Sequence, residues 1–451
     1  MELQANLNSE NVKTLTNSGA QGSAPKEGAQ YESADAGKYL SRDSSAPDGL
    51  TALVLSGGGS RGAYQVGVWQ ALNELGFRFD MVVGVSAGAL NGAMVCQGDQ
   101  VQAANLWRQI EADQVFGVES GAQPVDYVKE FMKTGGSGIS SEPLQKLIHE
   151  YAPEDALRES PVDLGILTIE LPAFKPHYLW KEDVPAGQLD DFIVASASVF
   201  PGIKPMRIDG VDYIDGGAIN VMPIHMAAER GAKHIVAVYL KAAGIVDMKK
   251  ELASCEDITL IEPHYDLGSF LVFDPDNSKR ILRLGYLDAM KAFGVYDGGP
   301  YFAFVKDAFD KRTLKQADCA AHIFELDPLI LYRPEFFLAK LQETVRAAAA
   351  ELDAATAEIE ETQKKMRSTR KNALLQLDLK KRFEELSLAA GLSLENVNQL
   401  FSQLNRKNTV LFIARDIAEK KQDSFFIRRP ALRVFAEEVA AARFISKYIE
   451  F

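Results

Sequence analysis

Two hydrophobic periodicities alternate along residues 51–94 and define the first elements of the chain. The apolar run at 51–55 predicts a short buried strand, and the run at 81–85 predicts another. Between them, apolar side chains recur at helical spacing: Val66, Val68, Trp69, Leu72 and Leu75. Gly76 ends this helix, since glycine enters the left-handed conformation cheaply. Residues 87–94 predict the next helix, so the order is strand, loop, helix, strand, turn, helix.

Similar patterns continue to about residue 294. They predict strands at 163–170, 177–180, 235–240 and 257–263, a hairpin over 208–217, and helices over 188–199 and 281–293. The run at 235–240 is continuously apolar, which is typical of a parallel strand buried on both faces. Strands that alternate with helices predict an α/β fold with a mostly parallel sheet.

The pattern changes at about residue 331, where apolar residues begin to repeat every seven positions. The repeat is Val345, Leu352, Ile359 and Met366, with Leu341, Ala348 and Ala355 at the intermediate positions. It favours a helical hairpin within the chain over a dimeric coiled coil. Helices continue to an amphipathic segment over 430–448. We therefore predict a disordered tail at 1–49, rich in Ser, Gly, Asn and Ala, an α/β domain at 50–330 and an all-helical region at 331–451.

A serine lies between glycines where the second strand turns into a helix. The segment Gly84-Val85-Ser86-Ala87-Gly88 has the G-x-S-x-G pattern of a nucleophile elbow, in which small neighbours permit a strained turn. The helix that follows directs free backbone N–H groups toward developing negative charge. G-x-S-x-G alone also occurs without any catalytic role, so the neighbouring loops decide its meaning.

A glycine-rich loop precedes this serine by one βα unit. It is Gly57-Gly58-Gly59-Ser60-Arg61-Gly62, and adjacent parallel strands would bring it to the same sheet edge as Ser86. Backbone amides beside a nucleophile are what acyl transfer requires. The loop also matches the dinucleotide fingerprint, which needs an acidic residue at the far end of the second strand. Asp80 instead begins that strand, which argues against the dinucleotide alternative.

The third motif is Asp215-Gly216-Gly217, at the end of the predicted hairpin. By itself it fits an ordinary turn, because Asp-Gly is a common turn pair. Together, GGGSRG at 57–62, GVSAG at 84–88 and DGG at 215–217 resemble the patatin-like phospholipase family, with its motifs in the same order. ASASVFP at 195–201 and NVMP at 220–223 agree, and the resemblance spans 51–294.

This resemblance implies a three-layer α/β/α core and a catalytic Ser–Asp dyad. By position, Ser86 would be the nucleophile and Asp215 its base, with backbone amides around Gly58, Gly59 and Ser60 forming the oxyanion hole. Arg61 would brace the loop or meet a phosphate. A free aspartate, with a pKa near 3.9, is a poor base at neutral pH, so burial would have to raise the pKa of Asp215. Among the six histidines, only His225 lies near the motif in sequence, as a minor alternative.

Composition narrows the function further. The 451 residues are 47% hydrophobic and carry a net charge of −13, which argues against nucleic acid as a ligand. The three cysteines, Cys96, Cys255 and Cys319, have no metal spacing and indicate isolated buried thiols of a reducing compartment. We expect neither a metal nor a cofactor. No long apolar stretch or secretory signal peptide is evident, so we expect a cytoplasmic protein, with a secreted, injected effector as the alternative.

Positive charge concentrates in one segment of the acidic chain. Residues 331–451 hold 21 basic and 17 acidic side chains, so the preceding residues carry −17. Eight basic residues lie within 364–382: Lys364, Lys365, Arg367, Arg370, Lys371, Lys380, Lys381 and Arg382. A solvated helix face is the ordinary interpretation, and contact with anionic lipid headgroups at a membrane surface is the functional one.

The resemblance to patatin-like phospholipases therefore implies a lipid acyl hydrolase of the phospholipase A or lysophospholipase type, which cleaves carboxylic esters through an acyl-enzyme. The substrate would be a phospholipid or another lipid ester, and the need for a protein activator is left open. The alternative from another class is a catalytically silent patatin-like protein that binds a lipid or a partner.

Overall fold

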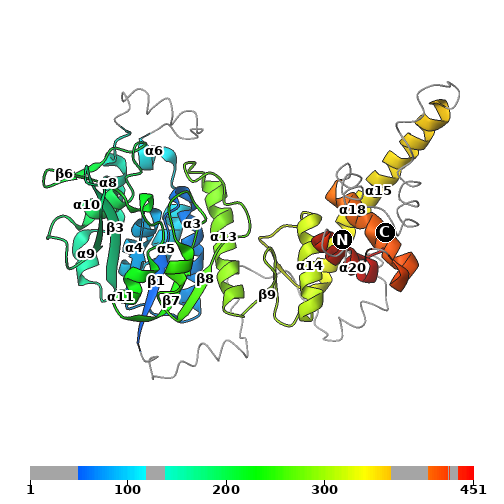
Figure 1. Ribbon diagram of the computed structural model, residues 1–451, viewed down its shortest axis with the longest axis horizontal. Helices are drawn as coiled ribbons and strands as arrows, with labels where there is room; N and C mark the ends of the chain where they lie inside the picture. The colour runs from blue at the N-terminus through cyan, green and yellow to red at the C-terminus, as the bar shows by residue number, and fades with distance from the viewer. Residues whose placement is uncertain (1–48, 118–137, 367–404, 425, 427–434, 451) are drawn as a thin grey trace. The chain divides into compact units, whose positions relative to one another are not determined.

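The computed structural model describes residues 49–117, 138–366, 405–424, 426 and 435–450 (Figure 1). The chain divides into two compact units between Val295 and Tyr296. We predicted a domain boundary between residues 330 and 331. The observed division comes earlier, and residues 296–330 belong to the C-terminal unit.

The N-terminal unit contains an eight-stranded sheet. Its strands are β1 (Leu50–Leu55), β2 (Met81–Gly84), β3 (Asp163–Leu171), β4 (Lys175–Trp180), β5 (Met206–Ile208), β6 (Val211–Asp215), β7 (Ala232–Val238) and β8 (Asp257–Ile261). The order is β5-β6-β3-β2-β1-β7-β8, and β4 also pairs with β3. Strands β3, β2, β1, β7 and β8 run parallel, whereas β4, β5 and β6 pair antiparallel. The sheet is thus mostly parallel, as predicted.

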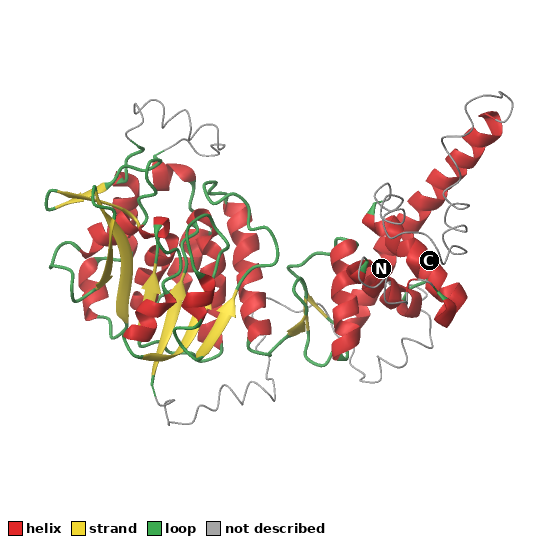
Figure 2. Ribbon diagram, in the orientation of Figure 1, coloured by secondary structure: helices red, strands yellow, loops and turns green. Residues whose placement is uncertain are grey.

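Helices cover both faces of this sheet in the three-layer α/β/α arrangement (Figure 2). They are α3 (Gly62–Glu74), α4 (Ala87–Gln97), α5 (Gln100–Trp107), α6 (Ala112–Phe116), α8 (Glu142–Tyr151), α9 (Glu154–Glu159), α10 (Leu189–Ser196), α11 (Ile224–Glu229), α12 (Met248–Leu252) and α13 (Pro275–Ala292). Short 3-10 helices η1 (Gly59–Arg61) and η2 (Gly216–Ala218) follow β1 and β6.

The layers follow from the apolar runs of the central strands. Alternate residues of one strand face opposite sides of a sheet, so Ala52 and Val54 of β1 pack with Met226 of α11 in one core cluster. Val82 of β2 faces the other side, where it lies beside Gly92 of α4. Both faces are buried, which accounts for strands that are apolar at every position.

The C-terminal unit combines a small sheet with helices. Its elements are β9 (Asp297–Gly298), β10 (Ala303–Phe304), α14 (Lys311–Ile323), β11 (Leu331–Tyr332), α15 (Pro334–Met366), α18 (Arg406–Lys420), η3 (Lys421–Asp423) and α20 (Ala436–Tyr448). Helix α14 packs against α20, and α20 against α18. Leu341 and Val345 of the predicted heptad pattern are fully buried in this unit.

Three expectations from the sequence concern the basic residues, a membrane-spanning helix and the cysteines. The eight basic residues proposed to contact a membrane lie outside the part whose side chains the structure describes. Within the described part, no helix is both long enough and apolar enough to cross a membrane. Of the three free cysteines, Cys96 is buried as predicted, whereas Cys255 and Cys319 are only partly so.

Candidate active site

The segment from β2 to α4 holds Ser86 in a strained turn. Ser86 has φ 55° and ψ −127°, a conformation that non-glycine residues rarely adopt. The two flanking glycines make room for it. A Cβ at Gly84 would lie 2.2 Å from the Gly88 carbonyl oxygen, and one at Gly88 would lie 2.1 Å from the Leu55 carbonyl oxygen. The predicted elbow therefore forms, and Ser86 precedes the first residue of α4, Ala87.

Asp215 ends β6 and begins the turn that its two glycines continue. The residue is 7% exposed, and its Oδ1 accepts a hydrogen bond from the Gly217 N–H at 2.7 Å. Burial raises the pKa of Asp215 to about 6, and hydrogen bonds from Gly217 and the Ser86 hydroxyl oppose that rise only in part. A Cβ at Gly216 would lie 2.4 Å from the Leu167 carbonyl oxygen of β3, so the turn packs directly on that strand.

The register of the sheet explains why the two side chains meet. Gly84 at the end of β2 pairs with Ile166 of β3, and Asp215 at the end of β6 pairs with Thr168. Both strands therefore finish within two residues of each other along β3. Ser86 and Asp215, which are 129 positions apart in the sequence, consequently line the same cavity.

The glycine loop contributes backbone amides beside them, though fewer than predicted. The Gly57 N–H donates to the Val221 carbonyl at 3.0 Å, and the Ser60 N–H donates to the Phe270 carbonyl at 2.9 Å. The amides of Gly58 and Gly59 have no acceptor among the described residues. The Ser60 amide, expected among the oxyanion donors, is already used to hold the loop, whereas those of Gly58 and Gly59 are not.

Arg61 braces the loop. Its Nε donates to the Gly268 carbonyl at 2.9 Å, and its guanidinium also donates to the carbonyls of Leu240 and Lys241 at 3.4 and 3.0 Å. Of the two roles considered from the sequence, the geometry matches the bracing one. Gly62 completes the motif at the start of α3, where a Cβ would lie 2.6 Å from the Trp107 ring.

Ser86 and Asp215 open onto an apolar cavity of about 530 Å³. Its walls come mainly from hydrophobic side chains, among them Leu90, Met94, Trp107, Ile148, Phe270 and Phe273. Val199 and Phe200 also line it, and they are 40% and 49% exposed. The apolar wall thus continues from Ser86 and Asp215 to the surface.

His225 lies away from this cavity and contacts a second buried carboxylate. Its Nδ1 lies 2.9 and 3.1 Å from the two carboxylate oxygens of Glu251, and its backbone N–H donates to the same group at 2.9 Å. Asn220 donates to Glu251 at 2.7 Å as well. His225 is not among the residues that line the cavity, so it has no place beside Ser86.

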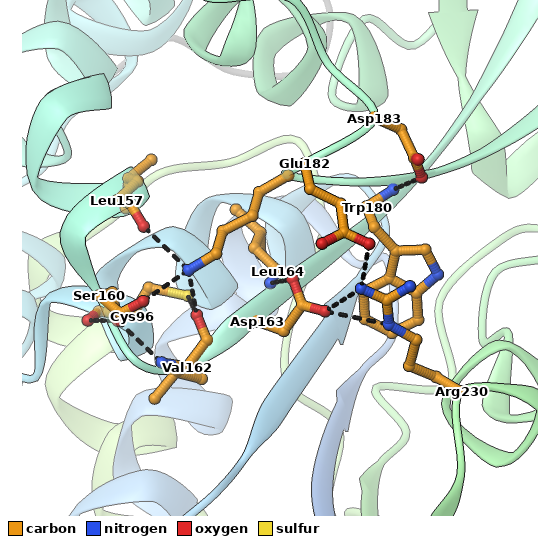
Figure 3. A network of polar contacts seen from close by, with 11 residues as sticks. Cys96, Leu157, Ser160, Val162, Asp163, Leu164, Trp180, Glu182, Asp183 and Arg230 are labelled. Atoms are coloured by element: carbon orange, nitrogen blue, oxygen red, sulfur yellow. Dashed lines mark hydrogen bonds and ion pairs between the residues drawn. The ribbon is translucent and has the colours of Figure 1, made fainter.

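At the opposite, amino-terminal end of β3, polar side chains form a network of hydrogen bonds and ion pairs (Figure 3). The Arg230 guanidinium donates to Asp163 and Glu182 and lies 4.6 Å from the centre of the Trp180 ring. Lys181 Nζ donates to three carbonyls, those of Leu157, Ser160 and Val162, at 3.3, 2.6 and 2.8 Å. Asp80 is also at this end, where it accepts a hydrogen bond from the Thr51 N–H at 2.7 Å. Asp80, the acidic residue considered for the dinucleotide alternative, therefore lies at the amino end of the strands, at the opposite end of the sheet from Ser86.

The geometry describes an α/β domain with a serine at an elbow, an aspartate beside it and a glycine loop in front. Residues 53–228 match the family model for patatin-like phospholipases. The chain therefore contains a patatin-like phospholipase domain over these residues.

The chain is also similar to several proteins with curated descriptions. The chain is 25% identical over 269 residues to the neuropathy target esterase sws of Drosophila melanogaster, covering 58% of this chain and 18% of that protein. It is 26% identical over 203 residues to lysophospholipase NTE1 of Scheffersomyces stipitis, covering 42% and 12%. It is 27% identical over 199 residues to YjjU of Escherichia coli, an uncharacterized protein, covering 42% and 52%. The alignment thus spans less than a fifth of the length of the first two.

Among solved structures, VipD from Legionella pneumophila aligns over 90% of this chain and 89% of its own, with 14% identity and a TM-score of 0.34. The type III effector protein ExoU aligns over 88% and 86%, with 15% identity and a TM-score of 0.31.

Proposed function

We propose that the chain is a lipid acyl hydrolase of the phospholipase A or lysophospholipase type, with Ser86 as the nucleophile and Asp215 as its base. One observation carries the proposal: an elbow serine and a buried aspartate line the same apolar cavity. A nucleophile requires an activating group, and an acyl chain requires apolar walls. The described residues supply both at one place.

The reaction begins with the ionised Asp215 carboxylate accepting the proton of the Ser86 hydroxyl. Ser86 Oγ attacks the acyl carbonyl carbon, and the carbonyl oxygen becomes negatively charged. The free amides of Gly58 and Gly59 stabilise that oxygen. The alcohol or lysolipid then leaves with the proton held by Asp215, and the acyl group stays on Ser86. Asp215 then accepts a proton from a water molecule, whose oxygen attacks the acyl carbon. The bond between that carbon and Ser86 Oγ breaks, Asp215 returns the proton to Ser86 Oγ, and the fatty acid is released.

An aspartate with an ordinary pKa is a weak base at neutral pH, and the raised pKa of Asp215 makes it a stronger one. General-base catalysis is most efficient when the pKa lies near the working pH. Burial raises the pKa of Asp215 to about 6, so most of the carboxylate is still ionised at pH 7. Asp215 is thus a stronger base than a solvated aspartate without losing its charge.

The substrate class follows from the cavity and the relatives. An apolar cavity of about 530 Å³ suits a fatty acyl chain. The exposed side chains of Val199 and Phe200 extend its wall to the surface, where a lipid would enter. The curated relatives include an esterase and a lysophospholipase, which directs the proposal to carboxylic esters of phospholipids and lysolipids.

The membrane surface is proposed from charge alone. The basic residues at 364–382 would attract anionic lipids by about 1 kcal/mol for each side chain near the surface. Reversing Lys364, Lys365, Lys380 and Lys381 to Glu should weaken sedimentation with anionic vesicles and leave the hydrolysis of a soluble ester unchanged. If the variant bound vesicles as well as the wild type, the ordinary interpretation of this segment as a solvated helix face would be favoured.

A fluorophosphonate probe and a soluble short-chain ester test the reaction. The wild-type chain should be labelled at Ser86 and should hydrolyse the ester, and Ser86→Ala should do neither. Asp212→Asn is a matched control for Asp215→Asn, because Asp212 is on the same strand with a side chain 42% exposed. A folded wild-type chain that is neither labelled nor active would instead favour the silent lipid- or partner-binding alternative.

A further inference from the structure

Strand β3 has two different partners along a single edge. β2 pairs with residues 163–166 and β6 with residues 168–171, whereas β4 pairs with residues 165–170. Since β4 overlaps both of the others, β2 and β6 must share the opposite edge. Their carboxyl ends therefore face each other across Leu167, the one β3 residue between the two paired stretches.

The hydroxyl of Ser196, the last residue of α10, occupies this gap. Ser196 Oγ donates to the Leu167 carbonyl at 2.8 Å and accepts the Ser86 N–H at 3.0 Å. Its side chain is fully buried. One hydroxyl thus satisfies the strand carbonyl in the gap and also holds the backbone of the proposed nucleophile.

The same segment holds the proposed base. The Asp215 N–H donates to the Ser198 carbonyl at 3.0 Å. Residues 196–198 therefore anchor the backbones of both Ser86 and Asp215. Ser86 depends on such an anchor because its φ of 55° is unfavourable for a residue with a Cβ.

We propose that Ser196 is a positioning residue for the proposed hydrolysis, on which this inference rests. By holding the Ser86 amide against β3, it fixes the nucleophile relative to Asp215 and to the amides of the glycine loop. It touches no substrate and transfers no proton. Without its hydroxyl, the Ser86 N–H and the Leu167 carbonyl both lose a buried partner, and the elbow is free to relax away from its reactive geometry.

Ser198 supplies a matched control within the same segment. It is also fully buried, but its hydroxyl donates to the Val194 carbonyl at 2.9 Å, four residues earlier in the chain. This bond is local to α10 and does not reach Ser86. Ser198→Ala removes the same atom from the same kind of site and leaves the Ser198 carbonyl in place for Asp215.

The experiment compares Ser196→Ala, Ser196→Cys and Ser198→Ala with the wild type on a soluble short-chain ester. kcat is expressed per site titrated with the fluorophosphonate probe, so that partial misfolding lowers the number of sites and not the rate per site. We expect Ser196→Ala to lower kcat by about 10- to 100-fold with KM unchanged, since small misplacements cost up to about 10². A thiol is a weaker donor and acceptor, so Ser196→Cys should fall between.

Ser198→Ala should keep the wild-type kcat per site even where its thermal midpoint falls. Equal kcat per titrated site in Ser196→Ala and Ser198→Ala would overturn the positioning role and leave the hydrolase proposal intact. A wild-type chain without turnover would overturn the hydrolase proposal, and the positioning role with it.

Discussion

Two buried carboxylates in the N-terminal unit are surrounded very differently. Asp215 receives hydrogen bonds from Gly217 and Ser86, and burial raises its pKa to about 6. Burial acts in the same direction on Glu251, but hydrogen bonds from His225 and Asn220 outweigh it, and the pKa of Glu251 is lowered. The number and charge of the donors separate a carboxylate suited to accept a proton from one that stays ionised.

The two groups are joined by one loop. Asn220, five residues after Asp215, donates to Glu251 at 2.7 Å, and its own side-chain oxygen accepts the Met222 N–H at 3.0 Å. Glu251, which accepts more hydrogen bonds, thus anchors the loop that begins with Asp215. This arrangement predicts that Glu251 supports stability and Asp215 supports activity, and that mutations at the two positions have opposite effects on stability.

The largest effect is expected from Asp215→Asn. Loss of a general base should lower kcat by about 10²–10⁴-fold. Because the pKa of Asp215 lies at about 6 instead of 3.8, ionisation of the buried group costs roughly 3 kcal/mol at pH 7. The variant does not bear this cost, so its free energy of unfolding should exceed that of the wild type by up to that amount. Chemical denaturation at pH 7 measures the difference. A destabilised variant would mean that the charged form makes favourable contacts we have not assigned.

The pH dependence should distinguish the two groups in the wild type. The proposed mechanism needs ionised Asp215, so kcat/KM on a soluble ester should fall about tenfold per pH unit below pH about 6. The contributions of Asp215 and Glu251 to the free energy of unfolding depend on pH in opposite directions. The contribution of Asp215 is fully present below its unfolded pKa of 3.8 and is lost as pH rises through about 6. That of Glu251 is present above its unfolded pKa of 4.5 and is lost as pH falls through its lowered folded value.

Denaturation of the wild type, Asp215→Asn and Glu251→Gln from pH 3.5 to 8 would resolve the two contributions. Activity that stays constant down to pH 4.5 would be incompatible with Asp215 as the base.

Glu251→Gln should destabilise the chain by about 1.5–3 kcal/mol at pH 7, because the charged acceptor of His225 and Asn220 is removed. Its kcat per site titrated with the probe should stay near that of the wild type, since the amide still accepts from Asn220. Chemical denaturation and active-site titration measure the two effects separately. Unchanged stability would remove the distinction between the two carboxylates.

The smallest effect is expected from Asn220→Ala. It deletes one of the donors to Glu251 and should lower stability by about 1 kcal/mol. The acid limb of kcat/KM should stay near pH 6, because the donors to Asp215 are Gly217 and Ser86. A displaced limb would show that Asn220 transmits the state of one carboxylate to the other.

The sequence was sufficient for the features that local patterns encode. Ser86, Asp215 and the glycine loop stand at ends of strands that apolar runs identify, and their order matches a known family. Contacts between distant segments were beyond it. The Ser60 amide is occupied by Phe270, which lies 210 positions later, and Ser196 owes its place to the register of β3. The division at Val295 was missed because β9, β10 and β11 have two residues each, too short for any periodicity.

The amine of Lys181 is a chemical probe for the amino end of β3. Its amine is held by three carbonyls in the described structure, so acylating reagents that modify exposed lysines should react with it only after those bonds open. Its labelling rate, followed by mass spectrometry, would report local opening at the amino end of the sheet. Lys175, exposed on β4 of the same sheet, provides the unprotected reference amine for that measurement.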